Sequence, residues 1–134
     1  MAIEREKAKS FYNLEVWQVG HSLVLDIYRI TNRFPKNELF CLTSQIRKAS
    51  VSVTSNLAEG FGRSSYKEKI YFYNISMGSV IEIQNQLLIS SDLKYISKED
   101  FLFIGEKTIK IHKMINALIK KIKINNNKTL TTNC

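Results

Sequence analysis

Residues 45–63 read Gln-Ile-Arg-Lys-Ala-Ser-Val-Ser-Val-Thr-Ser-Asn-Leu-Ala-Glu-Gly-Phe-Gly-Arg, and this stretch decides the fold. At about 100° per residue it is a helix with an apolar row and a polar row side by side. The apolar row is Leu42, Ile46, Ala49, Val53 and Leu57, and the polar row is Gln45, Ser52, Asn56, Glu59 and Arg63. Because the polar row borders the core-facing row, we expect its groups to be partly buried and bonded to another helix. Gly60 and Gly62 predict the end of the helix, since glycine readily adopts the left-handed conformation of a C-terminal cap.

The rest of the chain divides into further amphipathic helices on either side of this stretch. Apolar residues at helical spacing predict helices over approximately 14–33, 38–60, 65–93 and 99–123. Pro35 separates the first two, Ser65 and Glu68 form a capping box for the third, and Ser97 to Asp100 give a cap signal for the fourth. Short links between such helices predict an all-α fold, an antiparallel up-down-up-down four-helix bundle over residues 14–124. Residues 1–13 are expected to be an N-terminal lead-in, and the polar residues 125–134 a disordered tail.

The helix over residues 65–93 has an unusually broad apolar arc. Its apolar residues cover more than half of the circumference, and among them are Phe72, Met77, Ile81, Ile83 and Leu88. A helix that is apolar over so much of its surface contacts more than one neighbour. We therefore expect it to be central in the bundle or to lie at a subunit interface.

The net charge of +8 is unevenly distributed. Residues 107–134 contain seven lysines and no acid, whereas residues 1–106 contain thirteen cations and twelve acids. A basic segment of this kind suits a phosphate backbone or another polyanion. The alternative is a lysine-rich face that is only solvated.

Several classes of protein are disfavoured by what the sequence lacks. No run approaches the roughly 20 apolar residues of a membrane span, and the charged N-terminus lacks the apolar core of a signal peptide. Cys41 and Cys134 suit reduced thiols in a cytosolic protein. We therefore expect a cytoplasmic protein with no membrane partner.

An enzyme is also disfavoured. His21 and His112 have no metal-ligand spacing to another histidine or cysteine. Glu59 and Glu82 are the acids that we expect to be buried, but the Glu-x-x-His pairs of di-iron bundles are missing. The sequence therefore predicts no catalytic residue, no cofactor and no metal.

Several segments resemble the four-helix-bundle proteins of the 23S rRNA intervening-sequence family, over roughly residues 12–122. They are residues 14–18 (Leu-Glu-Val-Trp-Gln), 34–38 (Phe-Pro-Lys-Asn-Glu), 45–49, 52–60, 62–65 (Gly-Arg-Ser-Ser) and 78–82 (Gly-Ser-x-x-Glu). The block Asn-Leu-Ala-Glu-Gly-Phe-Gly-Arg at 56–63 is the most specific part. Lys48 departs from the family, which often has arginine there; lysine keeps the charge but loses the planar fork.

The resemblance implies more than the residues do. It implies an open reading frame within an insertion in a bacterial 23S rRNA gene, or standing alone in the genome. It also implies a ring-like homo-oligomer, typically a pentamer. The family is similar in fold to the basic accessory protein of diversity-generating retroelements, which works with a reverse transcriptase and nucleic acid.

Two groups of residues are candidates for a site. The candidate nucleic-acid-binding residues are expected to cluster around the ends of the second and third helices and along the fourth; they are Arg47, Lys48, Arg63, Lys67, Lys69, Lys110, Lys113, Lys120 and Lys121. Tyr66 and Tyr71 lie near them in the sequence and are candidates to stack on bases. The second group is a structural polar network of Gln45, Ser52, Asn56, Glu59, Ser79 and Glu82. In it Glu59 pairs with Arg63 or with a neighbouring Arg47, and Asn56 and Gln45 bond to Ser79 or Glu82. A ligand surface is the alternative for this row.

The sequence thus predicts a non-enzymatic, basic four-helix bundle that forms a homo-oligomer and binds RNA or DNA electrostatically. A reverse transcriptase or a ribosomal component is a further candidate partner. The alternative is an oligomeric scaffold or protein-interaction module without nucleic-acid binding.

Overall fold

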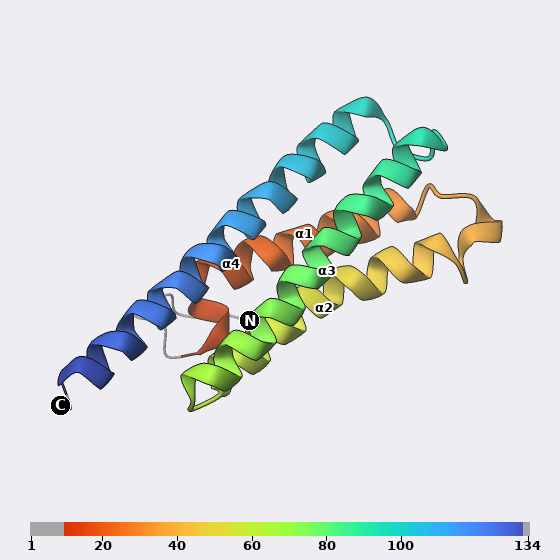
Figure 1. Cartoon of the computed structure of the whole chain (residues 1–134). Helices are drawn as coiled ribbons and strands as arrows, with labels where there is room; N and C mark the ends of the chain where they lie inside the picture. Colours follow the sequence, from red (N-terminus) through yellow and green to blue (C-terminus); the bar gives the residue numbers. More distant parts are fainter. Residues whose placement is uncertain (1–9, 133–134) are drawn as a thin grey trace.

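The structure, a computed structural model, describes residues 10–132, with side chains over residues 10–127. Its elements are the 3-10 turn η1 (Phe11–Asn13), α1 (Glu15–Thr31), the 3-10 turn η2 (Lys36–Glu38), α2 (Leu42–Gly62), α3 (Tyr66–Asp92) and α4 (Lys98–Thr132). Successive long helices run in opposite directions (Figure 1). The predicted all-α, up-down-up-down four-helix bundle is confirmed.

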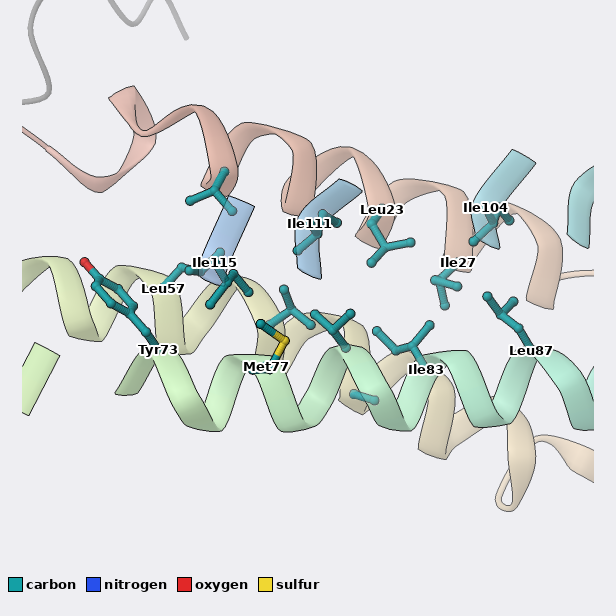
Figure 2. Close-up of a cluster of buried hydrophobic side chains, with 14 of the residues drawn as sticks. Leu23, Ile27, Leu57, Tyr73, Met77, Ile83, Leu87, Ile104, Ile111 and Ile115 are labelled. Carbon is teal, nitrogen blue, oxygen red and sulfur yellow. The ribbon is translucent and has the colours of Figure 1, made fainter. Parts of the chain in front are cut away.

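The four helices form a closed square around one core. Neighbouring pairs pack together, including α1 against α4, whereas Cα atoms of the diagonal pairs within residues 10–132 do not approach within 8 Å. The buried apolar side chains come from all four helices, and Figure 2 shows Leu23, Leu57, Ile83 and Ile111 among those that meet along the axis. Burial of such side chains is the main favourable term in folding. Within the described residues no helix combines the length and apolarity that crossing a bilayer needs.

The helix boundaries follow from local chemistry. α3 begins where Ser65 Oγ accepts a hydrogen bond from the Glu68 backbone N–H at 3.1 Å, and Ser97 Oγ accepts from the Asp100 N–H at 3.1 Å at the start of α4. Both cap signals were therefore read correctly from the sequence. α2 begins at Leu42, later than the predicted residue 38, because residues 36–38 form the separate turn η2.

Gly60 has a different role from the predicted helix stop. α2 continues to Gly62, and no glycine in the described residues has a positive φ angle. A Cβ at position 60 would lie 2.5 Å from Tyr73 Cε1, so glycine is required for the close approach of α2 to α3. The helix ends instead because Arg63 is extended, with φ −79° and ψ 146°.

α4 is longer than predicted. It runs through residues 125–132, where we expected a disordered tail, so that expectation is wrong for these residues. The asparagines at 125–127 lower helix propensity only modestly, and no proline or glycine follows Gly105 to break the backbone pattern. Residues 133–134 lie outside the described part, as do residues 1–9 of the predicted lead-in.

The links 32–41 and 93–97 lie together at one end of the bundle. The hydroxyl of Tyr95, in the second link, donates to Glu38 Oε2 of the first at 2.9 Å. This hydrogen bond and the burial of the ring raise the pKa of Tyr95. The second link begins with Lys94 in the left-handed conformation, with φ 60°. The N–H groups of Lys94 and Tyr95 bond back to Ser91 O and Ser90 O, which is a Schellman cap with a lysine where glycine is usual.

Candidate nucleic-acid interface

From Lys113, near its middle, toward its C-terminus, α4 presents a line of exposed lysines. Lys113, Lys120, Lys121 and Lys123 are all exposed, and their positions place them on the side of the helix away from the buried Ile111, Ile115 and Ile122. Because α4 is antiparallel to α3, this part of α4 lies beside the start of α3 (Figure 1). The charge of the acid-free segment is therefore gathered near one end of the bundle.

An open depression joins the two helices at this end. It has a volume of ≈ 390 Å³ and is lined by Tyr66, Lys67, Ile70, Lys123, Asn126 and Asn127. Two ammonium groups, an aromatic ring and two amides are the kinds of group that bind phosphate oxygens and stack on bases. We call Lys67, Lys113, Lys120, Lys121 and Lys123 the lysine end. Lys123 was absent from the predicted set, although the acid-free run already pointed to it.

Two predicted nucleic-acid residues are engaged within the chain instead. Lys69 Nζ donates to Gly60 O at 3.2 Å and Phe61 O at 2.7 Å, so it caps the C-terminal carbonyls of α2. Partial burial lowers the pKa of Lys69. Arg63 pairs with Glu59 at 3.0 Å and lies over the ring of Phe72. Lys69 thus has a structural role, and part of the Arg63 charge is already neutralised.

Arg47 and Lys48 do not join the other cations, and our prediction of one cluster was wrong. They lie in the first turns of α2, whereas Arg63 follows its last turn, roughly 24 Å away at 1.5 Å per residue. Arg47 Nε donates to Thr31 Oγ1 at 2.8 Å, and the guanidinium lies 4.8 Å from the ring centroid of Tyr28. Arg47 therefore ties α2 to α1, at the end opposite the lysine end.

Lys110 also differs from the lysine end. It lines a depression between α1 and α4 that holds Glu15 and Glu106, so nearby acids offset its field. The neighbouring Lys107 pairs with Asp26 and donates to Ser22 Oγ at 2.7 Å. The N-terminal half of α4 is thus close to neutral, in contrast to its C-terminal half.

The tyrosines that we considered as stacking platforms are both on the surface near the start of α3. Tyr66 lines the depression at the lysine end. Tyr71 is 61% exposed and makes an edge contact with Phe72, with ring centroids 5.2 Å apart. Tyr66 is therefore the one that stands directly beside candidate phosphate ligands.

The polar row of α2 forms hydrogen bonds at the junction with α3. Ser79 Oγ donates to Ser52 Oγ at 2.8 Å, and Asn56 Nδ2 donates to Ser52 O at 2.8 Å and Ser52 Oγ at 3.0 Å. Ser76 Oγ adds a bond to Val53 O at 2.8 Å. Asn56 thus bonds within its own helix, and Ser52 is the residue that reaches α3.

The two glutamates of the predicted polar network, Glu59 on α2 and Glu82 on α3, are exposed, which corrects our expectation that they are buried. The Glu59 side chain is 57% exposed, and Glu82 is exposed while it accepts from Gln86 Nε2 at 3.2 Å. Gln45 is exposed as well, and among residues 10–127 no side-chain hydrogen bond links it to Ser79 or Glu82. The row turns further from the α2–α3 seam than the sequence suggested, so only Ser52 and Asn56 of the row are shielded from solvent.

Comparisons with known proteins agree with this architecture. No curated protein matches the chain. A crystal structure of a protein of unknown function from the S23 ribosomal protein family of Bacteroides thetaiotaomicron is similar in fold, with a TM-score of 0.72 and 21% sequence identity. The match covers 78% of this chain and 95% of that one. The family model described as 23S rRNA-intervening sequence protein matches residues 12–117. The chain therefore belongs to the 23S rRNA-intervening sequence protein family.

Proposed function

We propose that this protein is a non-enzymatic, cytoplasmic assembly protein that binds RNA or DNA electrostatically through the lysine end. The observation that carries the proposal is the depression between α3 and α4, where Lys67 and Lys123 stand beside Tyr66 and two asparagines. Lysines neutralise phosphates without reading sequence, so binding is expected to be salt-sensitive and weakly specific.

The distribution of charge supports this choice of surface. Several cations elsewhere in the described residues have acidic partners within the chain: Lys107 pairs with Asp26, Arg29 with Asp100 and Arg63 with Glu59. The four α4 residues of the lysine end have no acid on their own stretch of that helix, and the fifth, Lys67, lies on α3 beside Glu68. A polyanion would therefore meet the least competition there.

Self-assembly is the second part of the proposal. Apolar side chains stay exposed on α3 and α4, including Ile81, Leu88, Leu102 and Ile109. Exposed large apolar side chains that gather on one face of a protein mark sites of interaction with other molecules. We propose a ring-like homo-oligomer, with five subunits as the family resemblance implies. A ring would repeat the lysine end around its axis and multiply the local field.

The competing function is an oligomeric scaffold that binds protein partners and no nucleic acid. It is favoured by the same exposed apolar surface and by the cations that already pair with acids of the chain, since these are less available to phosphates. A reverse transcriptase or a ribosomal component would then be recruited by the ring alone.

A binding titration separates the two functions. Fluorescent 23S rRNA fragments and DNA of equal length are titrated with the full chain at low and at moderate salt. The proposal predicts binding to both at low salt and a loss of affinity at moderate salt. Binding that is absent at low salt would refute the nucleic-acid proposal and leave the scaffold.

Charge reversal at single sites locates the surface. Lys120→Glu and Lys123→Glu are expected to weaken binding about ten-fold each, whereas Lys110→Glu, beside Glu15 and Glu106, should weaken it less. All three substitutions change the charge of the same helix by the same amount, so an equal loss of affinity in all three would argue against a localised binding site.

A further inference from the structure

Phe40 is the most exposed large apolar side chain among the described residues. It is 90% exposed and stands in the link between η2 and α2. Around it lie Tyr28, Leu39 and Val51, each more than a third exposed, which line a shallow depression on the outer α1–α2 face. A fully exposed phenylalanine loses the free energy of burial that its size offers. It therefore needs an explanation outside this single chain.

A matching apolar groove lies between α3 and α4. It has a volume of ≈ 320 Å³ and is lined by Gln84, Leu87, Leu88, Phe101, Gly105, Thr108 and Ile109. None of these side chains is charged, and the Gln84 amide already donates to Thr108 Oγ1 at 3.3 Å. Gly105 leaves the groove wall open, since a Cβ there would meet nothing within 4 Å. A glycine inside a helix is less favourable than alanine, and among the described residues no neighbour is close enough to require glycine at position 105.

The phenylalanine and the groove occupy opposite faces at the same end of the bundle. In the square of helices the α1–α2 side faces away from the α3–α4 side (Figure 1). The Tyr95–Glu38 hydrogen bond holds the link 32–41 next to the link 93–97, from which α4 starts. A closed ring of identical subunits needs two different, complementary surfaces on each subunit, at the same height along the ring axis. Phe40 and the groove meet this condition.

The charges that surround the two surfaces are complementary. Residues 29–48 contain five cations and one acid, whereas residues 92–106 contain four acids and two lysines. Arg33, Lys36 and Lys48 are exposed on the first side, and Asp92 and Glu99 are exposed near the end of α3 and the start of α4 on the second. Arg29 and Asp100 pair with each other, and Glu106 lies on the α1–α4 side, so these three do not contribute to this contact. Two copies that each carry +8 repel one another overall, so a contact between these two regions is the favourable way for them to meet.

We propose that Phe40 of one copy inserts into the α3–α4 groove of the next copy, between Leu88, Phe101 and Ile109. The contact is heterologous, because two different surfaces of the same chain meet, and it repeats around a ring. This inference rests on the proposed self-assembly and assigns the surfaces that perform it.

The test measures molar mass by light scattering on the full chain. Phe40→Asp removes the apolar side chain, and Gly105→Leu places a side chain in the groove at a position where a Cβ meets no atom within 4 Å. Each variant is expected to elute as a folded monomer under conditions where the wild type is an oligomer. The matched controls are Tyr71→Asp, which charges another exposed aromatic, and Gly78→Leu, which fills open space on α3 outside the groove. Both controls should assemble as the wild type does.

Mixing the two defective variants distinguishes this contact from any symmetric one. Phe40→Asp keeps an intact groove, and Gly105→Leu keeps Phe40, so a 1:1 mixture has one productive contact. The mixture is expected to form a dimer and nothing larger. A symmetric interface would give no dimer, because neither variant has an intact copy of it.

Each outcome of the mass measurements decides either the assembly or the Phe40–groove contact. A wild type that is monomeric would refute the proposed assembly itself, together with this contact. A wild type that assembles while Phe40→Asp and Gly105→Leu also assemble would overturn this contact alone. A mixture that stays monomeric, with both variants folded by circular dichroism, would also overturn it.

Discussion

Gly60 of α2 lies directly against the ring of Tyr73 of α3, so close that a Cβ on Gly60 would be 2.8 Å from Tyr73 Cδ1 and 2.5 Å from Cε1. Tyr73 is 2% exposed and belongs to the core. Position 60 therefore sets the distance between the two helices that pack most extensively in the bundle.

Gly60→Ala is expected to destabilise the protein by about 1 kcal/mol or more. Replacing a glycine inside a helix by alanine stabilises the helix by about 1 kcal/mol. At this position the added Cβ also forces the buried ring of Tyr73 to move, and such overpacking costs about 1–3 kcal/mol or more. Urea unfolding followed by circular dichroism measures the change. Gly78→Ala is the matched control, because open space surrounds that position, and it should stabilise by about 0.5–1 kcal/mol. Stabilisation by both substitutions would show that the contact between Gly60 and Tyr73 does not require a glycine.

Burial of the same ring predicts a loss of stability at high pH. Desolvation raises the pKa of Tyr73 to about 12, from 10.0 in the unfolded chain. Because the pKa of Tyr73 is higher in the folded chain than in the unfolded chain, folding is most favourable while the phenol is neutral. The free energy of unfolding is therefore unaffected by this group below pH 10 and falls as the pH rises toward 12. The free energy of unfolding, measured from pH 8 to pH 12, should fall more steeply in the wild type than in Tyr73→Phe. Parallel curves for the two proteins would contradict the assignment.

Lys94→Gly is expected to stabilise the protein by about 1 kcal/mol. Lys94 has a φ of 60°, a conformation that costs an L-residue roughly 1–2 kcal/mol and costs glycine little. Thermal unfolding should show a higher midpoint for the glycine variant. Lys94→Ala removes the same charge and keeps the Cβ, so it should show no such gain; a gain equal to that of glycine would assign the effect to charge.

Asp26→Asn is expected to destabilise the protein by about 1.5–3 kcal/mol. Lys107 donates to Asp26 and to Ser22 where both charged side chains are largely shielded from solvent, and this link joins α1 to α4. Removing one partner leaves the other charge without compensation. Glu59→Gln breaks an exposed pair with Arg63 and should cost less than about 1 kcal/mol. Denaturant unfolding measures the free energy of unfolding of both variants. Equal decreases would show that the Asp26–Lys107 pair stabilises the fold no more than the exposed Glu59–Arg63 pair does.

The local features of the fold were readable from the sequence. Helical periodicity and the serine caps at Ser65 and Ser97 gave the helices, because these signals depend on neighbours within one or two turns. Gly60 was misread because its reason, Tyr73, lies on another helix. The exposure of Glu59 and Glu82 depends on how far α2 rotates against α3, which periodicity fixes only to within part of a turn.

The candidate site was predictable only in part. The acid-free run gave the lysines of α4, but whether a cation is available depends on its partners. Asp26 neutralises Lys107, and the carbonyls of Gly60 and Phe61 engage Lys69. Arg47 and Lys48 lie in the same predicted helix as the most specific motif, residues 56–63, yet the length of α2 places them at the far end of the bundle.

The salt dependence of nucleic-acid affinity shows whether the lysine end binds phosphates. The slope of log affinity against log salt is measured for the wild type, for Lys120→Gln/Lys123→Gln and for Lys94→Gln/Lys98→Gln, two variants with the same loss of charge at opposite ends of the bundle. Each phosphate contact contributes about 0.7–0.9 to the slope. The account predicts that the Lys120/Lys123 variant loses about 1.5 from the slope while the Lys94/Lys98 variant keeps the wild-type slope. Equal slopes for all three proteins would contradict it.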